Sequence, residues 1–220
     1  MAVRTFLDRA EAGRLLAAEL IKRNFERPVI YALPRGGVAV AAPIAHALKA
    51  PLDLLIVRKI GAPFQPELAL GSIVDGERPD IILNEEVVRA AGMHEADIKK
   101  LADAELKEIE RRRRLYLPNR APVAAHNRTA ILVDDGIATG ASMRAAIAAV
   151  RRRAPSCLVV AVPVAPRATV QELTASAGEV VCLVAPEDFG AVGNFYADFH
   201  QLDDHEVDSL LRETDQHRAD

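Results

Sequence analysis

The stretch that decides the fold of this chain reads Ile131-Leu132-Val133-Asp134-Asp135-Gly136-Ile137-Ala138-Thr139-Gly140-Ala141-Ser142. Its opening apolar run predicts a buried strand, and the segment Met143–Arg153 that follows predicts a helix. Small residues between the two let backbone N–H groups approach an anion, and the helix N-terminus adds a partial positive charge. The stretch therefore predicts a strand, an anion-binding loop and a helix in that order.

Asp134 and Asp135 stand where the predicted strand ends. Carboxylates repel phosphate, but they accept hydrogen bonds from sugar hydroxyls or contact a metal ion that does. Together with the loop they predict a site for a phosphorylated sugar, with the phosphate in the loop and the diol on the acids. The alternative is a strand–turn–helix whose acids only cap the helix, for which one Asp would suffice.

Strands and helices alternate along most of the chain. Helical spacing predicts helices at 8–25, 38–49, 143–153 and 167–176, and apolar runs predict strands at 28–32, 52–57, 131–134, 157–162 and 180–184. This alternation is typical of a doubly wound α/β fold with a mostly parallel sheet of about five strands. Ligands bind at the carboxyl ends of such strands, which is where the acid pair would lie.

Residues 61–128 interrupt the alternation. Strand-like pieces at 68–74 and 81–83 predict a small antiparallel unit, residues 95–117 predict a long charged helix, and residues 119–127 resemble a loop. This region has too few large apolar residues for a core of its own. We therefore interpret residues 1–220 as a single domain with an insertion over its active face.

The long predicted helix carries four consecutive arginines, Arg111–Arg114. Glu105, Glu108 and Glu110 precede them, and acids before bases stabilise a helix by side-chain pairing, while cations suit its C-terminus. This order favours an exposed helix, either solvated or facing a second copy in a homodimer, over a nucleic-acid surface. A role near the substrate stays open.

The composition is that of an ordinary globular protein. The chain has 220 residues, is 50% hydrophobic and 27% charged, and has a formal net charge of -3, which gives no reason to expect nucleic-acid or membrane binding. Its apolar runs are too short to span a bilayer, and its first residues are charged too early for a signal peptide. Cys157 and Cys182 lie in strand-like runs and predict buried, reduced thiols and a cytoplasmic location; a disulfide between them is the alternative.

Two further segments supply cations near the predicted carboxyl edge. Leu33-Pro34-Arg35-Gly36-Gly37-Val38 follows the first strand, and its glycines permit close contact with an anion while Arg35 offers a guanidinium. Arg58 and Lys59 end the second predicted strand on the same face. An ordinary turn with a surface Arg, and cations that snorkel at a strand end, are the alternatives.

Aromatic residues gather after the last strand, although they make up only 4% of the chain. Residues 186–199 contain four of them, and aromatic faces suit stacking on a flat heterocycle. The alternative is that they pack a C-terminal cap. The four are Phe189, Phe195, Tyr196 and Phe199.

The stretch Ile131–Ser142 resembles the phosphoribosyl-diphosphate (PRPP) binding motif of type I phosphoribosyltransferases, and the resemblance covers roughly residues 28–57 and 131–198. It implies that Asp134 and Asp135 hold the ribose diol and Mg²⁺, directly or through water. It also implies that the loop grips the 5′-phosphate through Ile137, Ala138, Thr139, Gly140, Ala141 and Ser142.

The same resemblance assigns the flanking segments. Arg35, Gly36 and Gly37 would hold the pyrophosphate, with a non-proline cis peptide at Arg35–Gly36, and Arg58 and Lys59 would assist catalysis. Residues 62–72 resemble the mobile loop that closes over the reaction.

Residues 186–200 are similar to the family's hood, the segment that covers the base. Phe189 would stack on the base and Asp198 would approach the metal, although the spacing to Asp198 is one residue longer than usual.

The implied activity is transfer of a phosphoribosyl group from PRPP to a nitrogenous base, with Mg²⁺ and release of pyrophosphate. Ala138 replaces the Asp that hypoxanthine–guanine enzymes commonly carry, which weakens a 6-oxopurine assignment but leaves a purine-like base favoured. The insertion fits better a group of uncharacterised bacterial phosphoribosyltransferase-like proteins. A non-catalytic PRPP or nucleotide sensor is the first alternative, and a phosphosugar hydrolase with an Asp nucleophile is the second.

Overall fold

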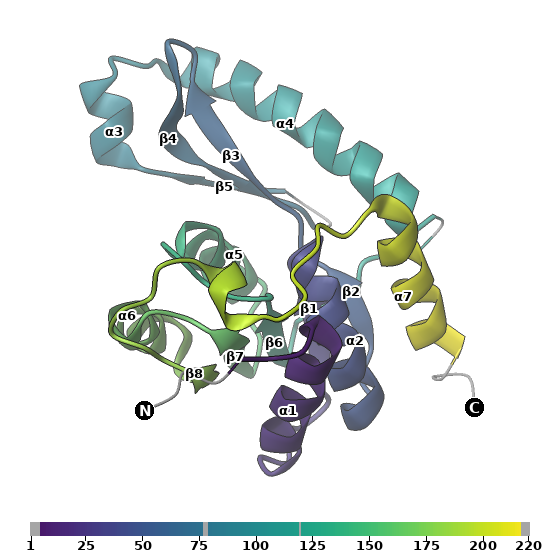
Figure 1. Cartoon of the computed structure of the whole chain (residues 1–220). Coiled ribbons are helices and arrows are strands. Elements are labelled where there is room, and N and C mark those ends of the chain that lie inside the picture. Colours follow the sequence, from purple (N-terminus) through teal and green to yellow (C-terminus); the bar gives the residue numbers. More distant parts are fainter. Residues whose placement is uncertain (1–4, 77–78, 119, 217–220) are drawn as a thin grey trace.

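The computed structural model describes residues 5–76, 79–118 and 120–216 (Figure 1). Its main sheet has five strands in the order β2-β1-β6-β7-β8, and all neighbouring pairs are parallel. This confirms the predicted α/β fold. The strands are β1 (Val29–Ala32), β2 (Leu52–Leu54), β6 (Thr129–Val133), β7 (Cys157–Val164) and β8 (Glu179–Val184).

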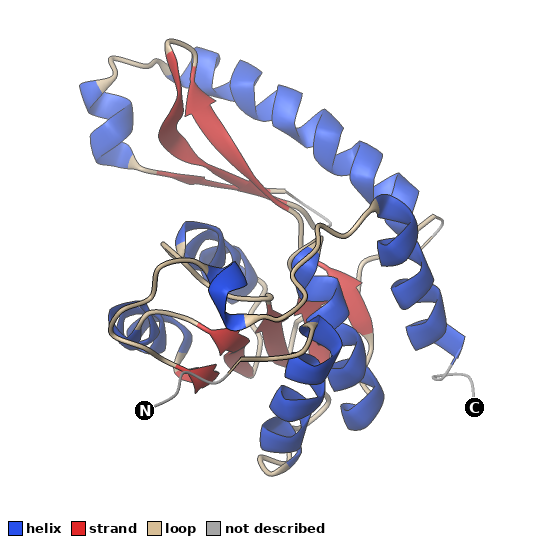
Figure 2. Ribbon diagram, viewed as in Figure 1, coloured by secondary structure: helices blue, strands red, loops and turns tan. Residues whose placement is uncertain are grey.

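Helices cover both faces of this sheet (Figure 2). Ile30 and Val133 face the apolar cluster under α1 (Arg9–Ile21) and α2 (Gly36–Leu48), whereas Tyr31 and Leu132 face the cluster under α5 (Ala141–Arg152) and α6 (Arg167–Ala177). Successive side chains in a strand point to opposite faces, so a strand buried on both sides must be apolar throughout. This is why the strands read as continuous apolar runs.

A second lobe rises over the main sheet (Figure 1). Its antiparallel sheet pairs β3 (Val57–Ala62), β4 (Gln65–Val74) and β5 (Asp80–Leu83), and it also contains α3 (Glu85–Ala90) and α4 (Glu95–Tyr116). The predicted strand 52–57 was wrong in its extent, because β2 ends at Leu54 and β3 begins at Val57 in the other sheet. Residues 62–72, which resemble the family's mobile loop in sequence, lie in the β3–β4 hairpin.

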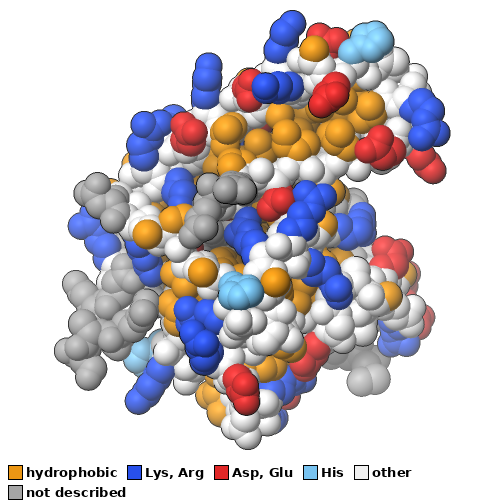
Figure 3. Space-filling model, turned by 180° about the vertical axis from the view of Figure 1, so that it is seen from behind, with side chains coloured by type: hydrophobic (Ala, Val, Ile, Leu, Met, Phe, Trp, Pro, Cys, Tyr) orange, Lys and Arg blue, Asp and Glu red, His pale blue; other side chains and the backbone are white. Residues whose placement is uncertain are grey.

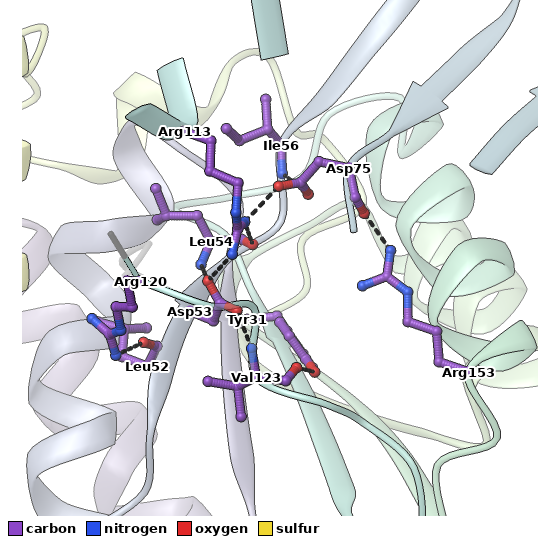
Figure 4. A network of polar contacts seen from close by, with 10 residues as sticks. All are labelled: Tyr31, Leu52, Asp53, Leu54, Ile56, Asp75, Arg113, Arg120, Val123 and Arg153. Carbon is purple, nitrogen blue, oxygen red and sulfur yellow. Dashed lines mark hydrogen bonds and ion pairs between the residues drawn. The ribbon is translucent and has the colours of Figure 1, made fainter. Parts of the chain in front are cut away.

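A buried ion cluster joins the lobe to the part of the chain that contains the main sheet, called the body below (Figure 4). Arg113 of α4 donates from Nη2 to Asp53 Oδ1 of β2 at 2.9 Å and from Nη1 to Asp75 Oδ2, just after β4, at 2.6 Å. Asp53 and Asp75 are 1% and 2% exposed. Their remaining bonds come from backbone N–H groups, including those of Leu54 and Ile56. The cluster therefore ties α4 and the end of β4 to the edge strand of the main sheet.

After β8 the chain runs back alongside the segment that precedes α1. Residues 186–200, with the short 3₁₀ turn η1 (Val192–Phe195), run beside the N-terminal segment, where Phe6 N–H donates to the Phe195 carbonyl at 2.8 Å. The last helix, α7 (Asp204–Gln216), packs on α2 and α4. None of the helices in the described ranges is long and apolar enough to cross a membrane.

The two cysteines differ from the prediction in burial. Cys157 is exposed because it is the first residue of β7, while Cys182 in β8 is half-buried. Both are free thiols, so the alternative of a disulfide between them is excluded.

Candidate functional site

The acid pair lies at the carboxyl edge of the main sheet. Asp134 and Asp135 follow the last residue of β6, and the backbone N–H of Leu33 donates to the Val133 carbonyl at 2.9 Å. This bond joins the ends of β1 and β6. The segment after β1, which carries Arg35, is therefore held beside the acids, as the parallel order of the strands predicts.

Gly36 and Gly37 pack directly against the acid pair. A Cβ added to Gly36 would lie 1.9 Å from Asp135 Oδ2, and one added to Gly37 would lie 2.7 Å from the Val133 carbonyl oxygen. Only glycine permits this close approach. The cis peptide bond is Pro34–Arg35, so the bond expected at Arg35–Gly36 was placed one residue too late.

Asp135 is held by two groups that sequence reasoning missed. Arg9 Nε donates to Asp135 Oδ2 at 2.7 Å, and the Tyr196 hydroxyl donates to the Asp135 carbonyl oxygen at 2.6 Å. Arg9 is only 8% exposed. One signal existed, because a cation in the first turn of a helix opposes the helix dipole and needs a compensating partner.

Asp134 has a different environment from its neighbour. Its Oδ1 accepts the backbone N–H of Asp135 at 2.9 Å. Burial, with the charge of Asp135 second, raises the pKa of Asp134 well above its usual value. A cation beside the pair would favour the charged form, so the two carboxylates fit a hard, oxygen-seeking ion.

Magnesium would need more donors than these acids supply. Within the described ranges, no group of three or more His, Cys, Asp or Glu side chains is arranged to hold a metal. Mg²⁺ often binds through one or two carboxylates and the phosphates of a substrate, and the acid pair fits that mode.

The predicted phosphate loop connects β6 to α5. Ala138, Thr139, Ala141 and Ser142 are exposed, and Gly140 adopts φ 75° as the N-cap of α5 without a side-chain cap. The first amides of α5 thus have no side-chain cap and suit an anion.

Two residues around this loop refine the picture. The N–H of Ile137 donates to the Val164 carbonyl at 2.9 Å and its side chain is buried, so it anchors the loop to β7. Arg144 of α5, absent from the sequence prediction, donates from Nη2 to the Thr139 carbonyl at 2.9 Å and adds a cation beside the loop.

Arg35 is loosely held. Its Nη1 lies 3.9 Å from Asp204 Oδ1, and 32% of its side chain is exposed. Asp204, at the start of α7, accepts the hydroxyl of Tyr116 at 2.5 Å. Because the Arg35 pair is long and partly solvated, the guanidinium is available to a competing anion.

Arg58 and Lys59 point to partners within the lobe. Arg58 Nε donates to Glu105 of α4 at 2.7 Å, and Lys59 Nζ donates to Glu67 of β4 at 3.0 Å. As neighbours in β3 they point to opposite faces of its sheet. The structure therefore does not place them as an adjacent pair of cations at the end of a parallel strand.

The hood aromatics mainly pack against one another. Phe189 stacks on Phe195 with centroids 5.5 Å apart, and Phe6 lies 5.4 Å from Tyr196. Phe195 and Tyr196 are buried, which supports the alternative of a packed cap for these two residues, while Phe189 stays half-buried.

Asp198 is exposed and bound to His200. It accepts the backbone N–H of His200 at 3.0 Å and contacts the His200 Nδ1 at 2.9 Å, and these hydrogen bonds lower the pKa of Asp198. This contact holds it at the end of the hood, and in the described part of the chain it is not grouped with Asp134 and Asp135 as a metal cluster.

Comparisons with known proteins agree with this geometry. Residues 4–200 match the family model described as a phosphoribosyl transferase domain. The crystal structure of TT1426 from Thermus thermophilus is 42% identical with a TM-score of 0.79, and the match covers 95% of this chain and 98% of that one. The AQ2163 protein of Aquifex aeolicus, 11% identical with a TM-score of 0.51 over 84% of this chain and 78% of its own, shows the fold alone.

A longer relative comes from Mycobacterium tuberculosis H37Rv. Rv0571c, provisionally named a phosphoribosyl transferase, is 43% identical over 209 residues, which is 95% of this chain and 47% of that protein. The chain thus spans about half the length of the curated relatives it matches. The family match covers nearly the whole chain, and the acid pair lies at the carboxyl edge of a parallel sheet. This chain therefore belongs to the type I phosphoribosyltransferase family.

Proposed function

We propose that this protein transfers the phosphoribosyl group of PRPP to a nitrogenous base and releases pyrophosphate. One observation carries the proposal: the acid pair lies beside Gly36 and Gly37 at the start of α2, and the loop that follows it leads to the α5 N-terminus, which has no side-chain cap. A sugar with a phosphate at one end and a pyrophosphate at the other matches these three neighbouring features.

The residues divide the work of binding and leaving-group stabilisation. Asp134 and Asp135 hold the ribose hydroxyls, and the amides and hydroxyls of residues 138–142 bind the 5′-phosphate. Arg35 exchanges its weak contact with Asp204 for the departing pyrophosphate. Bound Mg²⁺ supplies further positive charge on the phosphates. The rate then comes from orientation and preorganised charge around a developing ribose cation, without a protein nucleophile.

Lys59 and Arg58 have unequal parts in this proposal. The Glu67 partner of Lys59 is 92% exposed, and such a pair contributes about 0–1 kcal/mol, so a pyrophosphate can displace it. Arg58 forms an ion pair with Glu105, which is less exposed than Glu67, and this pair connects β3 to α4. We therefore assign catalytic assistance to Lys59 and a structural part to Arg58.

The acceptor is proposed to be a purine-like base. Phe189 remains half-buried beside Phe195 and offers a stacking surface, whereas Asp198, bound to His200, is a weaker candidate for reaching a metal. Ala138 is exposed and carries no proton acceptor for a 6-oxopurine. We propose a cytoplasmic location on the grounds of the two free thiols.

A homodimer is also part of the proposal. Hydrophobic side chains gather on the upper part of the molecule when it is seen from behind (Figure 3), which is where the lobe lies in Figure 1. Exposed large apolar residues of this lobe are Phe64, Ile81 and Leu115. Apolar surface of this kind is typical of an interface, and light scattering measures the oligomeric state directly.

The test is pyrophosphate release from PRPP and Mg²⁺ with a panel of bases. Release with one or a few bases is expected, and Asp135→Asn is the matched control that should bind PRPP measurably more weakly while staying folded. PRPP binding without release for any base would instead support a sensor, which the engagement of Arg58 by Glu105 within the lobe also favours. Phosphate release from phosphosugars alone would support a hydrolase.

A further inference from the structure

Arg9 is a buried cation that the mechanism above does not use. It occupies the first position of α1, where the helix dipole disfavours positive charge, and it is 8% exposed. Burying a guanidinium there is costly unless strong partners compensate. Its partners therefore identify what the residue does.

Three groups surround the Arg9 guanidinium. Nε donates to Asp135 Oδ2 at 2.7 Å, Nη1 donates to the His200 carbonyl at 2.9 Å, and the central carbon lies 3.9 Å from the centroid of the Phe199 ring. These partners come from the acid pair and from the end of the hood. One planar, permanently charged group thus connects the two parts of the proposed site.

The contact restrains Asp135 strongly. Its Oδ2 is enclosed between Arg9 and Gly36, since a Cβ on that glycine would lie 1.9 Å away. The Tyr196 hydroxyl restrains the Asp135 backbone from the hood side. A charge-assisted hydrogen bond of this kind sets the side-chain rotamer, so Oδ1 is the oxygen that would face a sugar hydroxyl.

We propose that Arg9 is a positioning residue for ribose recognition, which holds the Asp135 carboxylate in the orientation that binds the sugar and ties it to the hood. This inference rests on the proposed function, because it assigns the ribose to Asp135. It differs from a purely structural role in one respect. Loss of Arg9 should impair ligands that contain the ribose and spare pyrophosphate, which the proposed function assigns to Arg35, Gly36 and Gly37 at the start of α2.

The experiment measures PRPP, ribose 5-phosphate and pyrophosphate affinity by titration calorimetry with Mg²⁺. Arg9→Met is expected to weaken PRPP binding roughly tenfold or more, the effect of one lost charge-assisted hydrogen bond, and to leave pyrophosphate binding within about twofold. Arg9→Lys keeps the positive charge but lacks the planar set of guanidinium donors, so its PRPP affinity should lie between those of the parent and Arg9→Met. Arg14→Met, on an exposed position of the same helix, is the control and should match the parent.

A double-mutant cycle tests whether Arg9 acts through Asp135. In an Asp135→Asn background, Arg9→Met should weaken PRPP by less than about twofold further. Equal PRPP affinity in parent and Arg9→Met, or equal losses of PRPP and pyrophosphate, would overturn the inference. If Arg9→Met does not fold, unchanged PRPP affinity in Arg9→Lys overturns it as well.

The outcome also separates this inference from the proposed function. A parent protein that binds neither PRPP nor ribose 5-phosphate overturns both. A parent that binds them, with an Arg9→Met variant that binds them equally well, overturns only the role of Arg9.

Discussion

Removal of the Arg113 guanidinium should destabilise this protein strongly. Arg113→Met keeps much of the volume of the side chain but leaves two carboxylates, Asp53 and Asp75, at 1% and 2% exposure without their cation. Two charge-assisted hydrogen bonds of 2.9 and 2.6 Å are lost together with the bond to the Leu54 carbonyl. The perturbation thus creates uncompensated buried charge at the joint between lobe and body.

The magnitude follows from the burial of the partners. Breaking a buried ion pair by removing one member costs about 3–5 kcal/mol. The lower end applies here, because the Arg113 side chain is 17% exposed and Asp53 and Asp75 keep backbone N–H donors. A loss of about 3 kcal/mol in a domain of this size lowers Tm by roughly 6–12 °C.

The assay is scanning calorimetry with urea unfolding, and the neighbouring residue supplies the control. Arg114 is 78% exposed and pairs only loosely with Glu110, at 3.7 Å, so Arg114→Met should cost about 0–1 kcal/mol. Adding Asp75→Asn to Arg113→Met should recover part of the loss, since one buried charge disappears.

The pH dependence gives a second check on the same reasoning. Burial already raises the pKa of Asp75, and Arg113 opposes that rise, so the pKa should rise further in the variant. The folded variant then binds a proton more tightly than the unfolded chain, and its stability falls as pH increases. The deficit relative to the parent should be larger near pH 8 than near pH 5. A loss below about 1 kcal/mol that is equal at both pH values would refute the assignment of a buried charge cluster.

Three further predictions concern the site itself. Gly36→Ala should abolish PRPP binding in calorimetry, because the new Cβ would lie 1.9 Å from Asp135 Oδ2; affinity near that of the parent would contradict this packing. Asp134→Asn should raise the Tm of the unliganded protein near pH 8, and should raise it by less near pH 5. The reason is that the pKa of Asp134 is raised, so the parent protein loses stability as pH rises through that pKa. An equal change in Tm at both pH values in calorimetry would contradict a buried Asp134 carboxylate. Tyr196→Phe removes a 2.6 Å hydrogen bond to the Asp135 carbonyl and should lower the free energy of unfolding by about 1 kcal/mol in urea titrations, where no change would show that the bond is not formed.

Local patterns were enough to predict the main sheet and the position of Asp134 and Asp135 at its carboxyl edge. Continuous apolar runs are what a strand covered on both faces requires, and β1, β6, β7 and β8 were found where those runs lie. Asp134 and Asp135 were placed correctly at the strand ends because parallel strands bring their carboxyl ends to one edge.

Predictions failed where the chain passes from one sheet to the other without a break in its run of apolar residues. The apolar run 52–57 reads as one strand, yet the chain leaves the main sheet between Leu54 and Val57 and pairs with β4 instead. Arg58 and Lys59 therefore lie in β3 of the lobe and not at the end of a strand of the main sheet. Nothing in the spacing of apolar residues states which neighbour a strand will pair with.

The sequence by itself determined which segments form the sheet and which loop has the small residues for an anion, because both depend on local periodicity and backbone freedom. Only the tertiary structure decided that Arg9 meets Asp135 across 126 positions of sequence and that Arg113 joins Asp53 to Asp75. Such buried charges are stable only when their partners arrive together, so their pairing depends on the packing of the whole molecule.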